Sequence, residues 1–304
     1  MKRTVAVAAM LVAAVAVMTM VSSSSDTPKR PKILGIAGVQ VASTNIPRAR
    51  EFYRDVLVNT GCETCAARPM SEQVPTQRPI GLATGQEIEV VQQTAASAKC
   101  LLTEVAFLID DEPGFKRYLK AHSIAFKEMK TADGQYISTV DPEGHAIYFL
   151  TGKLQPVLFE GYPRIIHAGW VVKDRQAMDQ FYRDVLGFRL YWQGGMKDDR
   201  ADWVSMQVPD GTDWIEYMLN IPPDANKHLL GVMNHIALGV PSVQKAAEEL
   251  KKNGVKLTEE PKIGRDGKWQ LNLYDPDDTR VELMEFTPVE KPCCSEFTGT
   301  HPKP

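Results

Sequence analysis

The sequence lacks the basic excess by which many nucleic-acid-binding chains are recognised. Its 304 residues carry 35 Lys and Arg against 38 Asp and Glu, a net charge of −3, without a run of basic residues. Affinity for nucleic acid depends largely on basic patches that neutralise phosphates, so this class of function is disfavoured. The apolar share of 43% and the charged share of 24% are those of an ordinary globular chain. The length suits two domains.

Cysteine is scarce and odd in number. Cys62 and Cys65 form one C-x-x-C pair, Cys100 stands alone, and Cys293 and Cys294 are adjacent. A structural zinc site of the common kind needs a second C-x-x-C pair, which is missing. The disulfide state of these cysteines stays open at this stage.

A long apolar run occurs only at the N-terminus. Residues 1–21 begin with Lys2 and Arg3, and an apolar stretch from Val5 to Val21 follows, interrupted by Thr19. This is the layout of a secretory signal peptide, so we expect an exported protein, periplasmic or secreted. No A-x-A triplet marks a cleavage site, and the run is at the lower limit for crossing a bilayer. An uncleaved membrane anchor is therefore the alternative.

Proline marks the segments outside the expected domains. Pro28 and Pro31 keep residues 22–32 out of a helix, which predicts a linker. Residues 287–304 contain four prolines and the Cys-Cys pair, which predicts a loosely ordered C-terminal tail.

The chain is internally repetitive. FYRDVL occurs at 52–57 and again at 181–186. More finely, an apolar strand starts near residues 35, 103, 165 and 233, and each is followed by a helical apolar stripe and further strands. Asn45, Asp174 and Ser242 stand where helix N-caps belong. The pattern predicts an α+β fold of four βαβββ modules.

One module has a single helix and an open sheet, too little to bury a core alone. We therefore expect the modules to pair, the first two over residues 33–152 and the last two over 165–286. Residues 153–164 contain clustered Gly and Pro and are predicted to link the pairs.

Four polar residues interrupt the apolar strands of the second pair. His167 and His235 are 68 residues apart, and Glu216 and Glu282 are 66 apart, so one His/Glu pair recurs in the next module. Two carboxylates on an apolar face repel each other, and a divalent cation removes this cost. The pattern predicts one divalent metal ion, and the spacing does not choose between Zn, Ni, Fe and Mn.

These residues give the second pair a specific resemblance. The segments HAGWVVKD, FYRDVLGF, DWIEYMLN, NHIALGVPS and DPDDTRVELME resemble the vicinal oxygen chelate superfamily, and within it glyoxalase I (lactoylglutathione lyase). The resemblance implies two vicinal-oxygen-chelate domains with curled mixed sheets. It also implies His167, Glu216, His235 and Glu282 as the metal ligands.

The first pair resembles the family in layout but not in ligands. Gly38 replaces the first His, Glu104 the second His and Tyr148 the last Glu, and only Glu89 is retained. We therefore expect the first domain to be metal-free.

The resemblance implies a metal-dependent lyase or isomerase that chelates vicinal oxygens of a small substrate and shuttles a proton through an enediolate. Glu216 or Glu282 would be the catalytic base. Lys268 matches a family position facing an anionic substrate group, and Trp170 and Trp269 are further candidates for substrate binding. Val171 replaces the family arginine that holds glutathione, so the substrate stays open. The expected partner is this small molecule, and the chain is a monomer or homodimer.

Three other readings stay open. A two-domain extradiol ring-cleaving dioxygenase would use His167, His235 and Glu282, but Asn272 stands where that family has a tyrosine, and Glu216 has no use. A methylmalonyl-CoA-type epimerase would use nearly the same proton chemistry. A binding protein of the bleomycin-resistance type would sequester a ligand without chemistry.

Overall fold

The computed structural model describes residues 28–59, 79–82, 84–131, 134–152 and 163–304. The predicted signal segment, most of both predicted linkers, and Cys62 and Cys65 lie outside these ranges. Within the described part of the chain, no helix is long and apolar enough to cross a membrane.

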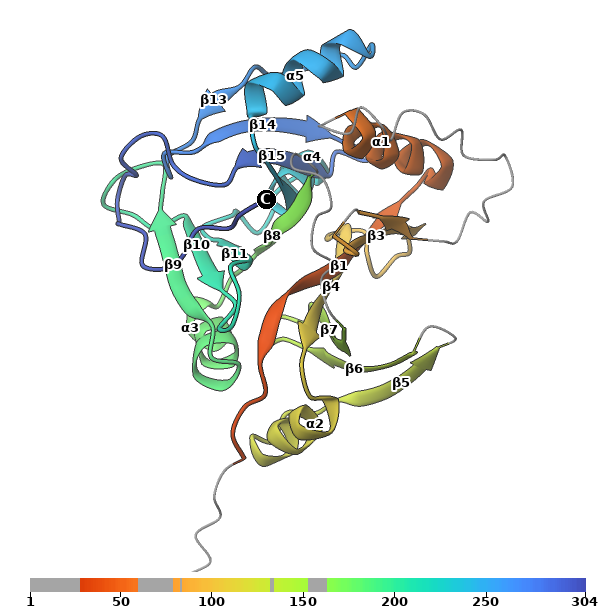
Figure 1. Ribbon diagram of the computed structural model, residues 1–304, viewed down its shortest axis with the longest axis vertical. Helices are drawn as coiled ribbons and strands as arrows, with labels where there is room; N and C mark the ends of the chain where they lie inside the picture. The colour runs from red at the N-terminus through yellow and green to blue at the C-terminus, as the bar shows by residue number, and fades with distance from the viewer. Residues whose placement is uncertain (1–27, 60–78, 83, 132–133, 153–162) are drawn as a thin grey trace, which may run out of the picture.

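The first half of the chain forms a seven-stranded mixed sheet with the order β2-β3-β1-β4-β7-β6-β5 (Figure 1). Its strands are β1 (Ile33–Ser43), β2 (Ile80–Gly81), β3 (Glu87–Gln92), β4 (Leu102–Ile109), β5 (Lys127–Thr131), β6 (Gly134–Val140) and β7 (Ala146–Thr151). The central pair, β1 and β4, is antiparallel, and β3 and β7 flank it in parallel.

The second half forms an eight-stranded sheet with the order β13-β14-β15-β12-β8-β11-β10-β9. Its strands are β8 (Arg164–Val171), β9 (Arg189–Gly194), β10 (Trp203–Gln207), β11 (Trp214–Met218), β12 (His235–Val240), β13 (Lys262–Ile263), β14 (Trp269–Tyr274) and β15 (Arg280–Glu285). The central pair, β8 and β12, is again antiparallel, and β11 and β15 flank it in parallel.

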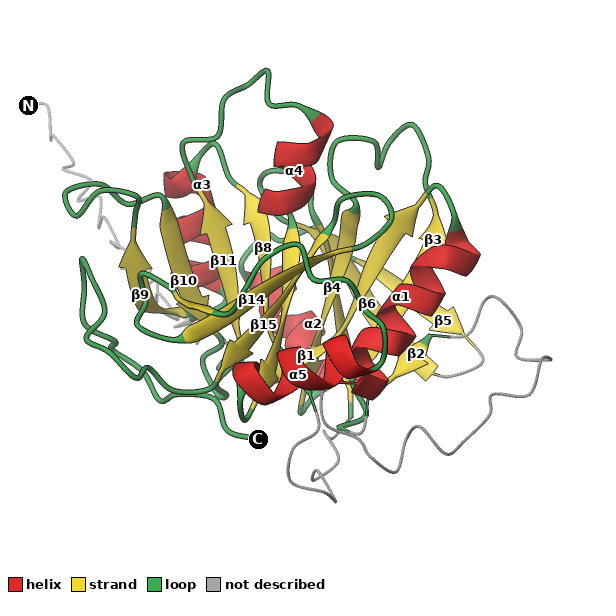
Figure 2. Cartoon of the chain, turned by 90° about the horizontal axis from the view of Figure 1, so that it is seen from above, coloured by secondary structure: helices red, strands yellow, loops and turns green. Residues whose placement is uncertain are grey.

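The helices are α1 (Ile46–Asn59), α2 (Glu112–Ala121), α3 (Arg175–Asp179), α4 (Lys227–Met233) and α5 (Val243–Lys252). The three predicted N-caps are confirmed, because the side chains of Asn45, Asp174 and Ser242 each accept from the backbone N–H three residues on. The first FYRDVL lies in α1, whereas the second lies largely in a π-helical turn that continues α3, η2 (Gln180–Val185). In Figure 2, α1 and α5 lie side by side, in agreement with the contacts between them.

The predicted fold class is confirmed. The second sheet is made by two consecutive βαβββ units, and the described residues of the first sheet form a βαββ unit followed by a βαβββ unit. The strands begin within a few residues of the predicted starts. The main apolar core contains buried side chains of both halves, so the two sheets pack on each other rather than standing apart. Gln86 links the two halves by hydrogen bonds, because its side-chain amide nitrogen donates to the carbonyls of Ile36 in the first half and Ile165 in the second, at 2.9 Å each.

The C-terminal tail differs from the prediction of a loosely ordered end. It runs along β9, where Thr298 N–H donates to the Tyr191 carbonyl at 3.0 Å and Ser295 exchanges hydrogen bonds with the backbone of Gln193. The prediction was wrong because β9 is the outer strand of its sheet, and its open edge offers unpaired backbone groups to any segment that reaches it.

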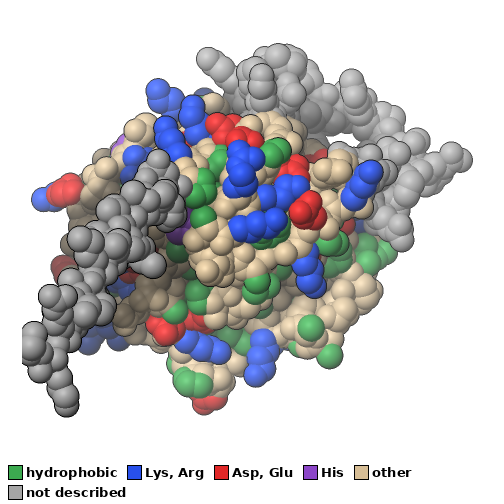
Figure 3. All heavy atoms as spheres, turned by 90° about the horizontal axis from the view of Figure 1, so that it is seen from below, with side chains coloured by type: hydrophobic (Ala, Val, Ile, Leu, Met, Phe, Trp, Pro, Cys, Tyr) green, Lys and Arg blue, Asp and Glu red, His purple; other side chains and the backbone are tan. Residues whose placement is uncertain are grey.

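The surface shows no strong separation of charge on the face drawn in Figure 3. There, Lys and Arg side chains of the described residues are interspersed with Asp and Glu, and apolar side chains are scattered between them. This agrees with the near-neutral composition.

Candidate metal centre

The four predicted ligands lie on four neighbouring strands of the second sheet. In the order of the sheet they are Glu282 on β15, His235 on β12, His167 on β8 and Glu216 on β11. The register aligns them, because Glu216 and His235 both pair with Gly169, while Ala237 pairs with both His167 and Glu282. The two histidines are therefore central and a carboxylate flanks them on each side.

The ligand atoms converge on one point. His167 Nε2 and His235 Nε2 are 3.0 Å apart. Glu216 Oε2 lies 3.8 Å and 3.4 Å from these two nitrogens, and Glu282 Oε2 lies 3.6 Å and 3.8 Å from them. Metal–ligand bonds of about 2.0–2.2 Å separate neighbouring ligand atoms by roughly 3.0–3.6 Å, so the spacing suits a first-row divalent ion.

The protonation states also suit a cation. Burial lowers the pKa of both imidazoles well below the usual value, so they are neutral. His235 Nδ1 lies 3.0 Å from the Met233 carbonyl, and a proton on Nδ1 leaves the Nε2 lone pair free for a metal. Burial raises the pKa of Glu282 to about 7. His167, His235 and Glu282, whose ligand atoms lie within 4.8 Å of one another, thus form a possible metal site.

Gly169 makes room for one of these ligands. A Cβ at this position would lie 2.2 Å from His235 Cε1, so only glycine lets the imidazole lie across β8. The sequence showed Gly169 on the same face as His167, but not that the ring from the next strand packs against it.

A cavity of about 310 Å³ opens beside the cluster. It lies at the small end of the range for ligand pockets. Its walls combine aromatic with charged and polar side chains, and Glu216 and Glu282 contribute to its lining, so the cavity opens onto the predicted ligands. The other lining residues that bear on its chemistry are Tyr191, Trp192, Trp203, Trp214, Lys262, Arg265, Asp266, Gln270, Asn272, Arg280 and Phe297.

Lys268, predicted to face the substrate, is instead fully buried behind the cavity wall. Its Nζ lies 4.8–5.3 Å from the ring centres of Trp214, Tyr191 and Phe297, and 3.3 Å from the Tyr191 hydroxyl. The prediction of direct contact is corrected, because Lys268 does not line the cavity and its ammonium packs against these rings instead. Burial lowers the pKa of Lys268 to about 8, and its charge still acts on Glu216 and Glu282.

The two predicted tryptophans do not line the cavity either. Trp170 is fully buried between the two sheets, where its indole N–H donates to the Leu102 carbonyl and its ring stacks on His145. Strand alternation explains this, since Trp170 follows His167 by three positions and so points to the opposite face of β8. Trp269, at the start of β14, packs against the main apolar core. The prediction of substrate contact is corrected for both.

The first half of the chain contains four positions that are equivalent to the predicted metal ligands of the second half. Its register matches that of the second half, because Gln40 pairs with both Glu89 and Glu104, and Ala106 pairs with both Gly38 and Tyr148. This confirms the predicted equivalence of these residues to the four ligands.

In the first half, the residues at the positions equivalent to the metal ligands make hydrogen bonds with protein side chains. Gln40 Nε2 donates to Glu89 at 2.8 Å, and the Tyr148 hydroxyl donates to Glu104 at 3.1 Å. A smaller cavity of about 140 Å³ lies beside them. That this half binds no metal stays a prediction.

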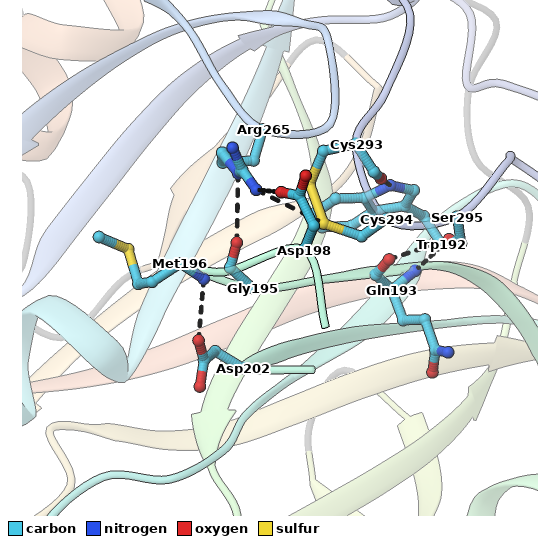
Figure 4. Close-up of a disulfide and its surroundings, with 10 residues drawn as sticks. All are labelled: Trp192, Gln193, Gly195, Met196, Asp198, Asp202, Arg265, Cys293, Cys294 and Ser295. Atoms are coloured by element: carbon cyan, nitrogen blue, oxygen red, sulfur yellow. Dashed lines mark hydrogen bonds and ion pairs between the residues drawn. A yellow bond between two sulfur atoms is a disulfide. The ribbon is translucent and has the colours of Figure 1, made fainter. Parts of the chain in front are cut away.

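The C-terminal tail contributes Phe297 to the lining of the large cavity, and Figure 4 shows the surroundings of the disulfide in this tail. Cys293 and Cys294 form a disulfide with each other. Arg265 pairs with Asp198 and donates to the Gly195 carbonyl at 3.2 Å in the loop after β9, and its own carbonyl accepts from the Cys293 N–H of the tail at 2.8 Å. Cys100 is a free, partly buried thiol.

Sequence reasoning missed several residues that line the cavity. Arg280 precedes Glu282 by two positions in β15, so strand alternation alone places both on one face. Phe297 could not be found in this way, because it reaches the cavity only through the docking of the tail.

Comparison with known proteins agrees with this geometry. Residues 164–283 match the family described as the Glyoxalase/Bleomycin resistance protein/Dioxygenase superfamily. This match agrees with the resemblance that the sequence predicted for residues 165–286.

A curated relative is the probable chloroplastic lactoylglutathione lyase of Arabidopsis thaliana. It is 27% identical over 135 residues, which are 43% of this chain and 38% of the relative. The match thus spans well under half the length of that protein.

Solved structures resemble nearly the whole chain. Homoprotocatechuate 2,3-dioxygenase from Arthrobacter globiformis has a TM-score of 0.60 at 16% identity and covers 85% of this chain and 82% of its own. The 2,3-dioxygenase LapB from Pseudomonas sp. KL28 also has a TM-score of 0.60 at 16% identity, with 91% and 96% covered. At this identity the likeness concerns the fold.

Proposed function

We propose that the protein is a divalent-metal-dependent lyase or isomerase of the glyoxalase type, acting on a small substrate with neighbouring oxygens. The observation that carries this proposal is the convergence of two neutral histidines and two glutamates beside one cavity. When bound, the metal supplies a Lewis acid that polarises a substrate oxygen and makes an adjacent C–H more acidic.

The residues around the cavity have separate roles in metal binding and proton transfer. His167 and His235 would hold the metal with neutral nitrogens, so the two glutamates alone would balance its charge. Glu216 and Glu282 line the cavity, and either can take a proton from one carbon and return it to the next. Ser205 donates to Glu216 at 3.3 Å and orients its carboxylate.

A ring-cleaving dioxygenase is the second candidate. The favouring observation is that the ligand atoms of His167, His235 and Glu282 lie within 4.8 Å of one another and form a possible metal site without a fourth residue. A three-residue His/His/carboxylate set with open positions is typical of non-haem iron oxygenases.

Metal analysis and a substrate panel test the proposal. The purified protein is expected to hold about one divalent ion per chain, and His235→Ala to lose it. The metal-loaded enzyme is expected to isomerise adducts of 2-oxoaldehydes with small thiols, without consuming O₂ in the presence of catechols. O₂ consumption that survives Glu216→Gln would replace the proposal with the dioxygenase. A wild type that retains no Zn, Ni, Fe or Mn would replace it with a metal-free binding protein.

A further inference from the structure

Arg280 is the one cavity-lining cation without an ion pair among the described residues. Lys262 pairs with Glu259 at 2.8 Å, and Arg265 pairs with Asp198. Arg280 makes no hydrogen bond or ion pair in the described part of the chain, and its Nε is buried without a partner. Because a buried donor without an acceptor is costly, this side chain calls for a partner that enters the cavity.

Two more residues that line the cavity each have a buried polar atom without a hydrogen-bond partner. The indole nitrogen of Trp214 and the side-chain oxygen of Asn272 have no partner among the described residues. Both side chains are more than nine-tenths buried, with exposures of 2% and 7%, and both line the cavity. The residues of the wall thus hold two donors and one acceptor that have no partner among the described residues.

The net charge of the groups around the cavity predicts the charge of that ligand. With a divalent cation in place, the charges of Glu216 and Glu282 are neutralised. Asp266 and Lys268 oppose each other in charge at and behind the wall. Arg280 then leaves one positive charge, which a monoanion matches.

We propose that Arg280 determines substrate specificity by binding the carboxylate of a small organic acid, whose apolar part lies against the tryptophan walls. This inference rests on the proposed function, since the charge balance includes the metal. Arginine suits the task because its planar donors match the two oxygens of a carboxylate. A dianion such as phosphate would leave a negative charge uncompensated in the cavity.

Binding measurements with the metal-loaded protein test the proposal. Quenching of tryptophan fluorescence is titrated with benzoate and phenylglyoxylate, and with benzamide and phenylglyoxylamide as neutral counterparts. The wild type is expected to bind each acid roughly 10- to 100-fold more tightly than its amide. Arg280→Gln is expected to lose this preference, and Arg280→Lys to retain part of it.

Matched control variants distinguish binding of the acid by Arg280 from binding by the other cations that line the cavity. Lys262→Gln and Arg265→Gln remove cations that already have partners, and both variants are expected to keep the preference for the acids.

Metal content is measured for every variant. Arg280→Gln should retain the metal ion, because loss of the arginine removes a positive charge near the site. If Arg280→Gln still prefers the acids, the metal itself binds them and the proposal is overturned. It is also overturned if the wild type shows no preference or binds none of the acids. Metal loss from the wild type is a separate result, which overturns the proposed function.

Discussion

At the scale of single residues, the spacing of His167, Glu216, His235 and Glu282 was enough to predict that they meet. The reason is that each residue belongs to a strand of a repeated module, so equal spacing in sequence becomes equivalent placement in the sheet. The environment of each side chain was less predictable. Lys268 lies behind the cavity wall, because its position depends on rings from three other segments.

Gly169 provides a residue-scale test of the ligand geometry. Gly169→Ala places a methyl group against the His235 ring, at 2.2 Å from Cε1 before any shift. We expect the ring to move and metal affinity to fall at least about 10-fold, as other disturbances of ligand orientation cause. Competition with a chromogenic chelator measures the affinity. Gly81→Ala is the matched control, since its Cβ meets nothing within 4 Å, and an equal loss there would contradict the account.

The pH dependence of metal binding follows from the same residues. Burial raises the pKa of Glu282 to about 7 in the metal-free protein, whereas both imidazoles are already neutral because burial lowers their pKa. The raised pKa means that a proton on Glu282 competes with the metal as the pH falls through about 7, so affinity declines from about pH 8 to about pH 6.

Calorimetry in buffers of different ionisation enthalpy measures the protons released. About one proton per metal ion is expected at about pH 6 and almost none at about pH 8. Release of two or more protons at the lower pH would mean that the histidines carry protons in the metal-free protein, against the account.

At the scale of elements, the βαβββ units could be predicted because apolar periodicity and capping residues are local signals. The C-terminal tail could not, because its order comes from the open edge of β9 rather than from its own sequence. Phe297 then lines the cavity, and His301 Nδ1 lies 2.5 Å from the hydroxyl of Tyr191 in the cavity wall.

Removal of the tail tests its part in the cavity. A chain ending at Pro292 lacks Phe297 and His301 but retains all four ligands. We expect it to keep its metal, while acrylamide quenches the tryptophans of the cavity more strongly and ligand binding weakens. Thr300→Ala, which leaves the Thr300 carbonyl bonded to Gln207, is the control. Unchanged quenching in the truncated chain would show that the tail does not cover the wall.

At the scale of the whole molecule, the pairing of modules was predictable, because one module is too small to bury its own core. The way in which the two halves interlock was not, since it depends on side chains that are far apart in the sequence. Asp277 accepts from the hydroxyl groups of Ser43 and Thr44 at 2.5 Å each, and from the Thr44 N–H at 3.0 Å.

Asp277→Asn tests this contact between the halves. The change leaves Ser43 and Thr44 with poorer acceptors, so we expect the free energy of unfolding to fall by about 1–3 kcal/mol. Burial raises the pKa of Asp277, but the hydrogen bonds from Ser43 and Thr44 outweigh it and hold the pKa below the usual value. The stabilisation is therefore present above about pH 4 and is lost as the pH falls through the lowered pKa.

Urea denaturation of wild type and variant at about pH 7 and at about pH 3.5 gives both quantities. Asp278→Asn is the control and should change little, because the side chain of this neighbouring residue is 50% exposed and does not contact Ser43 or Thr44 in the described structure. An effect of Asp277→Asn that is the same at both pH values would contradict the assignment to the ionised carboxylate.

The most direct test of the central claim is anomalous diffraction from crystals of the metal-loaded protein, collected at the absorption edge of the bound metal. The account predicts one strong anomalous peak in the second half of the chain, within bonding distance of His167 Nε2, His235 Nε2 and carboxylate oxygens of Glu216 and Glu282. A chain without this peak, or with the metal held elsewhere, would contradict it.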